Sequence, residues 1–276
     1  MDTKVIFNQL QRIAFEKKRP VKEVLQYYAM ERFLYRLSVS PYKDSFFLKG
    51  GLMLMVWNPA NHRATIDIDL LAKMPNTIPK VKKVIEEICR QQVEPDGVVF
   101  VSNSLQLTPA QVQAKYQGIA IALLARIFSA ILSLRIDIGF NGRIFPCPSE
   151  ITYPALLNFP APILRGYTIE TTIAEKFEAI VRLGSANTRM KDFYDIWLLL
   201  QQHSFDLKEL ESVIQKVLHR RNTKMDQMPR AFSPSFYTNP SKLKIWDAFI
   251  KGISREKLSL EKVILFLRKY FEFLYP

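Results

Sequence analysis

The stretch Arg63-Ala-Thr-Ile-Asp-Ile-Asp-Leu-Leu71 alternates between apolar and polar side chains. An extended chain would place Ile66, Ile68 and Leu70 on one apolar face and Arg63, Thr65, Asp67 and Asp69 on the other, because strand side chains alternate between two faces. The pattern predicts a strand over residues 63–71 that presents two carboxylates side by side. These like charges favour a cation between them, and hard oxygen ligands suit Mg²⁺. A solvated strand face is the other interpretation.

A glycine pair precedes this strand, in Phe46-Phe-Leu-Lys-Gly-Gly-Leu-Met-Leu-Met55. Gly50 and Gly51 would let the backbone approach a ligand closely, and the start of a following helix would favour an anion. Lys49 would add a positive charge for a phosphate. The glycines alone could form an ordinary tight turn. A phosphate-binding loop followed by a strand with Asp-x-Asp is the order typical of a nucleotidyltransferase.

A third carboxylate occurs in a second alternating stretch, Ser133-Leu-Arg-Ile-Asp-Ile-Gly-Phe140. If this strand neighbours the first, Asp137 joins Asp67 and Asp69 on one sheet face. Three carboxylates can hold two metal ions for an in-line transfer of a phosphoryl group. Asp137 could instead take the proton from an incoming hydroxyl. A surface salt bridge with a neighbouring Arg or Lys is the alternative for Asp137.

The chain of 276 residues is strongly basic, with a net charge of +13. Residues 1–50 carry 10 Lys and Arg against 5 Asp and Glu, and residues 200–276 carry 14 against 8. The positive excess is therefore concentrated at the two ends, and it favours encounter with polyanions such as RNA or an NTP.

The remaining composition is that of a globular protein, with 48% hydrophobic and 24% charged residues. No uncharged apolar stretch reaches the roughly 20 residues of a membrane span, and the first residues lack a signal-peptide pattern. Cys89 and Cys147 stand in unrelated contexts, so the sequence indicates neither a disulfide framework nor a zinc site. We therefore expect a cytoplasmic protein.

Periodicity predicts helices and strands in an α+β arrangement. A capping box of Thr172 and Glu175 predicts the start of a helix that ends at Gly184 and carries Lys176 in its first turn. Asn141-Gly142 predicts a hairpin turn. The expected helices cover residues 3–16, 20–39, 77–92, 172–183 and 189–202, and residues 45–57 are expected to form a glycine loop followed by a helix. The expected strands cover 63–71, 98–101, 104–107, 121–128, 131–140 and 143–147.

These motifs together resemble the AbiEii/AbiGii-type nucleotidyltransferase toxins, a branch of the polymerase-β-like nucleotidyltransferase superfamily. The resemblance covers most of residues 1–200. Its motifs are Val24-Leu-Gln-Tyr-Tyr28, Glu31-Arg-Phe-Leu-Tyr-Arg-Leu37, Phe47-Leu-Lys-Gly-Gly51, Arg63-x-Thr65-x-Asp67-x-Asp69, Arg135-Ile-Asp137-Ile138, Ile173-Ala-Glu-Lys176 and Arg189-x-Lys191-Asp192-x-Tyr194-Asp195. The interval from Gly51 to Asp67 is longer than the minimal family pattern. Gly51 also stands where many relatives carry a serine, so no role of a serine hydroxyl is expected.

The resemblance implies a small mixed-sheet nucleotidyltransferase core with N-terminal helices over residues 1–165, and a helical domain over 166–276 that completes the active-site cleft. It implies a catalytic set of Asp67, Asp69, Asp137, Lys176 and Asp195, of which the first three would bind Mg²⁺ or Mn²⁺. It also implies a nucleotide-binding set of Lys49, Gly50, Gly51, Arg63, Thr65, Arg182, Lys191 and Asp192.

The second group of these residues lies on predicted helices. Lys191 and Asp195 are four positions apart and Asp192 and Asp195 three apart, so they share one side of a helix. Lys176 and Arg182 would border one cleft. Asp192 or Asp195 would orient the positively charged side chain of Lys176, Arg182 or Lys191. Solvated lysines and ordinary ion pairs along a helix are the alternative explanation.

The implied activity is that of the toxin of a toxin–antitoxin pair, which transfers a nucleotide from an NTP to an RNA 3′ end. The favoured acceptor is tRNA, and the expected antitoxin is a winged-helix regulator. One alternative keeps the chemistry but modifies a protein hydroxyl or a small molecule. Another is a non-catalytic module that binds RNA or a partner on the same fold, against which the complete set of three carboxylates argues.

Overall fold

The computed structural model describes residues 2–59, 63–113, 116–140, 144–225, 227–253 and 258–275. The chain forms two compact units. The first comprises Met1–Arg143 and Pro148–Tyr167, and the second comprises Ile144–Cys147 and Thr168–Pro276.

The first unit is built on a mixed sheet, in which the described residues form seven strands in the order β3-β4-β5-β2-β1-β7-β6. Strands β2 and β5 pair in parallel, as do β1 and β7, and the other neighbours are antiparallel. The mixed α+β fold predicted from the sequence is confirmed. The strands are β1 (Phe46–Lys49), β2 (Asp67–Ala72), β3 (Val98–Gln113), β4 (Tyr116–Ile127), β5 (Ala130–Phe140), β6 (Ser149–Thr152) and β7 (Ile163–Gly166).

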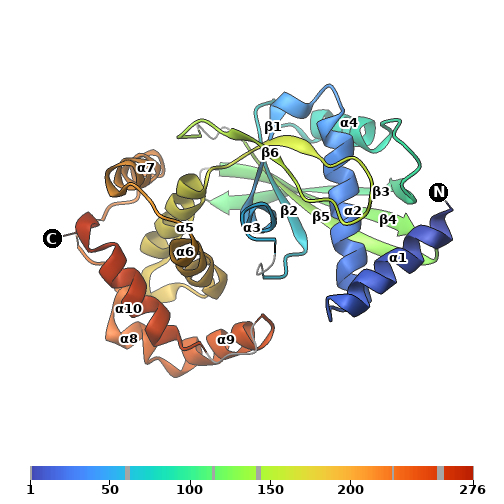
Figure 1. Ribbon diagram of the computed structural model, residues 1–276. Helices are drawn as coiled ribbons and strands as arrows, with labels where there is room; N and C mark the ends of the chain where they lie inside the picture. The colour runs from blue at the N-terminus through green and yellow to red at the C-terminus, as the bar shows by residue number, and fades with distance from the viewer. Residues whose placement is uncertain are drawn as a thin grey trace. The chain divides into compact units, whose positions relative to one another are not determined.

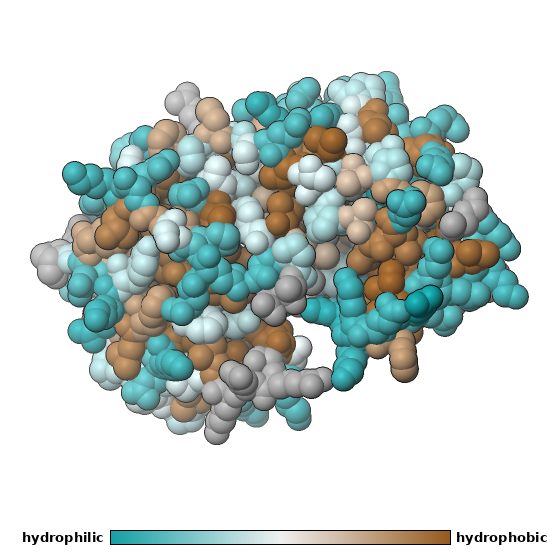
Figure 2. All heavy atoms as spheres, in the orientation of Figure 1, coloured by the Kyte–Doolittle hydropathy of each residue, from teal (hydrophilic) through white to brown (hydrophobic). Residues whose placement is uncertain are grey.

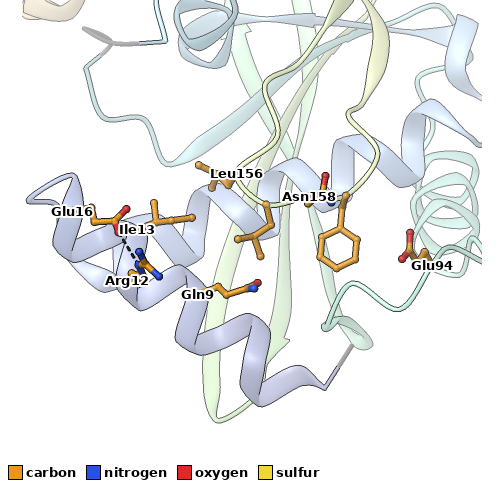
Figure 3. Close-up of a pocket in the computed structure, with 9 residues that line it drawn as sticks. Gln9, Arg12, Ile13, Glu16, Glu94, Leu156 and Asn158 are labelled. Carbon is orange, nitrogen blue, oxygen red and sulfur yellow. Dashed lines mark hydrogen bonds and ion pairs between the residues drawn. The ribbon is translucent and has the colours of Figure 1, made fainter.

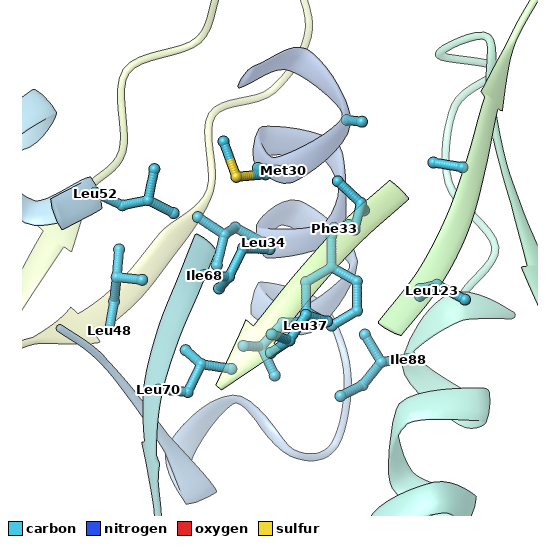
Figure 4. Close-up of a cluster of buried hydrophobic side chains, with 14 of the residues drawn as sticks. Met30, Phe33, Leu34, Leu37, Leu48, Leu52, Ile68, Leu70, Ile88 and Leu123 are labelled. Carbon is cyan, nitrogen blue, oxygen red and sulfur yellow. The ribbon is translucent and has the colours of Figure 1, made fainter. Parts of the chain in front are cut away.

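Helices cover one face of this sheet (Figure 1). Figure 4 shows the apolar side of α2 with Met30, Phe33 and Leu34 directed toward Ile68 and Leu70 of β2. Burial of large apolar side chains supplies about 1.5–3 kcal/mol each. Because Ile68 and Leu70 point into this core, Asp67 and Asp69 must point to the opposite face. The helices of the unit are α1 (Thr3–Glu16), α2 (Val21–Ser38), α3 (Met53–Trp57) and α4 (Ile78–Cys89), with 3₁₀ turns η1 (Lys43–Ser45) and η2 (Gly50–Leu52).

Two buried charged residues of α2, Glu31 and Arg32, bind the backbone of the loop that precedes β7. The fully buried Glu31 accepts a hydrogen bond from the Leu156 amide at 2.7 Å. Its neighbour Arg32 pairs with Glu31 at 2.7 Å and donates to the Pro160 carbonyl at 2.8 Å. Burial raises the pKa of Glu31 to about 7, against the lowering effect of Arg32. Such buried ions need partners, and the loop backbone supplies some of them.

The second unit is helical. Helix α5 packs against α6 and α7, and α10 packs against α6. Aromatic side chains fill its interior, including Phe177, Phe193, Phe232 and Phe271. Its helices are α5 (Ile169–Leu183), α6 (Met190–Gln202), α7 (Leu207–Arg220), α8 (Pro234–Tyr237), α9 (Pro240–Lys251) and α10 (Leu260–Tyr270), with 3₁₀ turns η3 (Gly184–Ala186), η4 (Arg230–Phe232) and η5 (Glu272–Leu274).

The start of α5 differs from the prediction. The N-cap is Thr168, whose hydroxyl accepts the Thr171 amide at 3.2 Å, so Thr172 lies inside the helix. Both threonines suit a cap, and the helix takes the earlier one. Lys176 is therefore in the second turn and not in the first. The predicted end at Gly184 is confirmed.

Several strand predictions also need correction. Strand β2 begins at Asp67, and the preceding Ile66 is exposed. Strands β3 and β4 are longer than the predicted segments, because a register shift between Val101 and Gln106 interrupts the alternation without ending β3.

The remaining corrections concern two short segments. Residues 46–49 form a strand where a loop and helix were predicted, and residues 144–147 form no strand. Pro146 removes a ladder donor in the second of these segments, which disfavours a strand. The predicted turn at Asn141-Gly142 lies outside the described residues.

Hydrophobic residues form separate patches between hydrophilic ones on the molecular face drawn in Figure 2. None of the helices in the described ranges is both long enough and apolar enough to cross a membrane.

Candidate active site

A glycine turn at the end of β1 lies against the Asp-x-Asp strand. Gly50 has φ +71°, and a Cβ there would lie 2.0 Å from Oδ2 of Asp69. A Cβ on Gly51 would lie 2.7 Å from Oγ1 of Thr65. Glycine at both positions thus permits the close approach that the sequence predicted, although the atoms approached in this structure belong to the protein.

The strand registers place charged residues in one row across the sheet. Lys49 of β1 is the partner of Asp69 of β2, and Asp69 is the partner of Asp137 of β5. Paired residues project from the same face of a sheet. The predicted neighbourhood of Lys49, Asp69 and Asp137 is therefore present, and Asp67 lies in the row of Arg135.

Arg135 is the cation among these carboxylates. Its Nε lies 3.1 Å and 3.2 Å from the two carboxylate oxygens of Asp137 and 3.9 Å from Oδ1 of Asp67. The hydrogen bond that Arg135 donates to Asp137, with the negative charges of Asp137, Asp67 and Asp69, raises the pKa of Arg135. The salt bridge considered for Asp137 is thus formed. The sequence did not indicate the additional approach to Asp67, because that contact depends on the parallel register of β2 and β5.

The three carboxylates have the donor chemistry of a site for a divalent cation. Asp67, Asp69 and Asp137 offer the hard oxygen atoms that Mg²⁺ prefers, and the side chains of Asp67 and Asp137 are 29% and 31% exposed. Within the described residues, no three His, Cys, Asp or Glu side chains converge closely enough to hold a metal ion. The donor chemistry therefore fits the metal, but occupancy would require Arg135 to release its carboxylates.

Arg63 and Thr65 lie before β2 and next to the glycine turn. Arg63 is buried and donates from Nη1 to the Ala64 carbonyl at 3.1 Å. The Thr65 amide donates to the hydroxyl of Tyr27 at 2.9 Å. A Cβ atom on Gly51 would lie 2.7 Å from Oγ1 of Thr65 and 3.4 Å from Nη2 of Arg63. Arg63 and Thr65 are therefore both neighbours of the glycine turn.

A second charged group lies between α5 and α6. Nζ of Lys176 lies 2.8 Å from Asp192 and 2.8 Å from Asp195. Both carboxylates are fully buried and the lysine side chain is 12% exposed. The predicted association of Lys176 with these aspartates is present in the structure.

Arg189 is a member of this group that the site prediction omitted. Its Nε donates to Oδ2 of Asp192 at 2.6 Å. Burial alone would raise the pKa of Asp192, but the charges of Lys176 and Arg189 and their hydrogen bonds lower it to about 2. Asp192 is therefore ionised at neutral pH. The sequence could have indicated this ion pair, because Asp192 follows Arg189 by three positions and residues so spaced are neighbours on a helix.

Arg182 and Lys191 are placed differently from the prediction. Arg182 pairs through Nε with Glu178 at 3.0 Å, so its carboxylate partner is neither Asp192 nor Asp195. Glu178 also accepts from Arg221 at 2.9 Å and Thr223 at 2.6 Å. Lys191 is exposed, and Asp195 pairs with Lys176 instead.

The predicted residues thus form two groups. Lys49, Gly50, Gly51, Arg63, Thr65, Asp67, Asp69 and Asp137 lie in the first unit, and Lys176, Arg182, Lys191, Asp192 and Asp195 lie in the second. A cavity of about 530 Å³ between α1 and the loop at Leu156 contains none of them (Figure 3).

Two solved structures have a fold similar to that of this chain. The nucleotidyltransferase toxin MenT4 of Mycobacterium tuberculosis superposes with a TM-score of 0.61 at 16% identity, over 99% of this chain and 89% of that one. JHP933 of Helicobacter pylori gives a TM-score of 0.51 at 15% identity, over 91% of each chain. At these identities the likeness shows a shared fold.

Two sequence comparisons add to this likeness. An uncharacterized protein of Aquifex aeolicus is 49% identical over 41 residues, which are 15% of this chain and 18% of that protein. The sequence model of a family described as nucleotidyl transferase AbiEii toxin, type IV TA system, matches residues 32–272. Because that match spans most of the chain, the protein belongs to the AbiEii family of nucleotidyltransferase toxins of toxin–antitoxin systems.

Proposed function

We propose that this toxin transfers a nucleotide from an NTP to the 3′ end of an RNA, with tRNA as the acceptor. The 3′ oxygen would attack the α-phosphorus, a new P–O bond would form, and the bond to the oxygen bridging the α and β phosphates would break. Pyrophosphate would leave. The observation that carries the proposal is the row of Lys49, Asp69 and Asp137 beside the glycine turn.

The residues of the first unit would orient the reacting groups. Lys49, Arg63 and the turn at Gly50 and Gly51 would hold phosphate oxygens, and Thr65 would keep the turn in place. Asp137, on the strand next to Asp69, would accept the proton of the attacking hydroxyl. Arg135 would have to leave Asp137 before that carboxylate could act, because its Nε now occupies both oxygens.

Asp67, Asp69 and Asp137 would hold Mg²⁺ or Mn²⁺. A bound divalent ion would neutralise charge on the phosphates, which is the usual contribution of such ions to phosphoryl transfer. Until it binds, the guanidinium of Arg135 balances part of the carboxylate charge, which accounts for three acidic residues on one sheet face.

The helical unit would contribute Lys176. Asp192 and Asp195 fix its ammonium group by two contacts of 2.8 Å, and such preorganised charges stabilise developing negative charge without a cost of reorientation. Asp195 would act through Lys176, and Asp192 through Lys176 and Arg189. In this proposal residues 1–165 form the nucleotidyltransferase core, residues 166–276 complete its cleft, and Lys191 contributes to nucleotide binding.

The identity of the acceptor and the antitoxin are the finer parts of the proposal. The net charge of +13 supports a polyanionic acceptor over a protein hydroxyl or a small molecule. The family membership supports a cognate antitoxin, which we propose to be a winged-helix regulator.

The test is to incubate the full chain with total RNA, the four NTPs and Mg²⁺, and to sequence RNA 3′ ends. We expect untemplated nucleotides on tRNA that are missing when the protein is omitted. The same reaction with α-labelled NTP and a cell lysate freed of RNA separates the alternatives. Label in protein or in a small molecule, with unchanged RNA ends, would overturn the RNA proposal.

A further inference from the structure

A cavity of about 350 Å³ in the helical unit is lined by three cations from separate segments. Arg182 lies near the end of α5, Lys224 follows α7, and Arg230 begins η4. The wall between them is formed by Leu183, Gly184 and Ser185 on one side and by Met225 and Met228 on the other.

The described lining residues include no carboxylate and no aromatic side chain. Glu178 pairs with Arg182, and Lys224 and Arg230 add two further positive charges that an incoming anion would stabilise. The sequence of this loop holds one carboxylate, Asp226, which lies outside the described residues, so the cations outnumber it. The cavity offers no aromatic surface for a base, and its three cations suit a phosphate.

Buried contacts hold the cavity in shape. Glu178 is fully buried and binds Nε of Arg182 at 3.0 Å. The same carboxylate accepts from Arg221 of the α7 end and from Thr223, which directly precedes Lys224. Glu178 binds Arg182 through Nε only. Within the described residues, the two Nη nitrogens of Arg182 donate to no protein acceptor.

The cavity is separate from the group at Lys176. Lys176 contacts α6 through Asp192 and Asp195, whereas Glu178 and Arg182 face the end of α7. Six positions along a helix correspond to roughly 9 Å of rise and about 120° of rotation. One triphosphate held by Lys176 would therefore leave this cavity empty.

We propose that the cavity of Arg182, Lys224 and Arg230 binds a backbone phosphate of the RNA acceptor. Contacts of this kind position a nucleic acid without reading its sequence. The inference rests on the proposed function only in naming RNA as the polyanion, because binding can be measured without transfer.

The test compares two double variants of the full chain that lose the same charge. Lys224→Gln/Arg230→Gln alters the cavity, and Lys262→Gln/Lys269→Gln alters the exposed side of α10. All four side chains are exposed, so both variants should keep the melting temperature of the wild type. The probe is a fluorescent 20-nucleotide oligouridylate, and its affinity is measured between about 50 and 200 mM salt.

We expect the cavity variant to bind the oligonucleotide at least tenfold more weakly at the lowest salt. The magnitude of the slope of log affinity against log salt should fall by about 0.7, because one phosphate contact on a single strand is lost. The α10 variant should lose less than threefold. Equal losses in both variants, or no binding by the wild type, would overturn the inference.

A second arm distinguishes the phosphate of RNA from that of a nucleotide. Inorganic triphosphate should bind the cavity variant as it binds the wild type. If the variant loses triphosphate and keeps the oligonucleotide, the cavity serves the nucleotide and the proposal is wrong. If the wild type transfers nucleotides to RNA and the cavity variant binds RNA normally, this inference alone is refuted. If the cavity variant loses RNA binding and the wild type shows no transfer, the proposed function alone is refuted.

Discussion

At the scale of single residues, Asp67 and Asp69 carry the chemistry of the proposal. Asp67→Asn and Asp69→Asn should each reduce nucleotide transfer below about a tenth of the wild-type rate, because a lost metal-borne contact costs several kcal/mol in the transition state. Asp247→Asn on the exposed side of α9 is the matched control and should retain full activity. Transfer assays and thermal melts on the same preparations check this. A rate above that tenth in either site variant would rule out the metal role.

Gly50 tests the geometry of the turn. Gly50→Ala would place a methyl group 2.0 Å from Oδ2 of Asp69 at a φ of +71°, so Asp69 must move. We expect transfer to fall at least tenfold and the free energy of unfolding to drop by about 1 kcal/mol or more. Gly252→Ala is the control, since its Cβ would lie 3.4 Å from the nearest atom and its φ is −81°. Normal activity of Gly50→Ala would show that the turn plays no part in the reaction.

The sequence predicted much of this site because alternation alone assigns strand faces. Ile68 and Ile136 fill the core, so Asp69 and Asp137 had to share the other face once their strands paired. The contact of Arg135 with Asp67 was not predictable, because it requires the parallel register of β2 and β5.

At the scale of elements, the contact between α5 and α6 depends on Lys176. In the structure Lys176 lies between two fully buried carboxylates, which would lose this partner with the lysine. Lys176→Met should therefore lower the free energy of unfolding by about 3–5 kcal/mol and reduce transfer at least a hundredfold.

A triple variant separates these two effects. Lys176→Met/Asp192→Asn/Asp195→Asn removes the buried charges together and should recover most of the lost stability while remaining inactive. Denaturant unfolding and transfer rates measured side by side decide the matter. A stable triple variant with normal turnover would show that Lys176 is only structural. Lys208→Met on the exposed side of α7 should change neither quantity.

The lowered pKa of Asp192 gives a pH dependence with a defined sign. Its folded pKa of about 2 lies below the unfolded value of about 3.9. The group therefore adds stability above pH 4, and this contribution of roughly 2 kcal/mol disappears as pH falls from 4 to 2. The difference in unfolding free energy between wild type and Asp192→Asn should shrink over that interval and stay constant from pH 5 to 7. A constant difference down to pH 2 would contradict the assigned ion pairs.

The element boundaries show what local sequence could not decide. Thr168 and Thr172 are both good caps, and the choice of Thr168 accompanies a hydrogen bond from the Thr171 hydroxyl to the Phe145 carbonyl. That partner is distant in sequence. The apolar residues 46–48 were assigned to a loop and helix, although pairing with β2 and β7 makes them a central strand.

At the scale of the whole molecule, the class of fold and the family followed from the order of motifs along the chain. The glycine turn, Asp-x-Asp and Arg135-Ile-Asp137 are separated in sequence but lie on neighbouring strands. The basic excess at the two ends could be counted from the sequence. That Arg182 lines one cavity with Lys224 and Arg230 could not be read from the sequence, because it requires the fold of α5 against α7.

The proposed reaction moves a nucleotide rather than the terminal phosphoryl group of the NTP. The most direct test supplies two NTP samples with total RNA and Mg²⁺, one labelled at the α-phosphate and the other at the γ-phosphate. We predict that the α label enters RNA and that the γ label leaves in pyrophosphate, with Asp69→Asn incorporating neither. Entry of the γ label into any acceptor, or failure of the α label to enter RNA, protein or small molecules, would contradict the account.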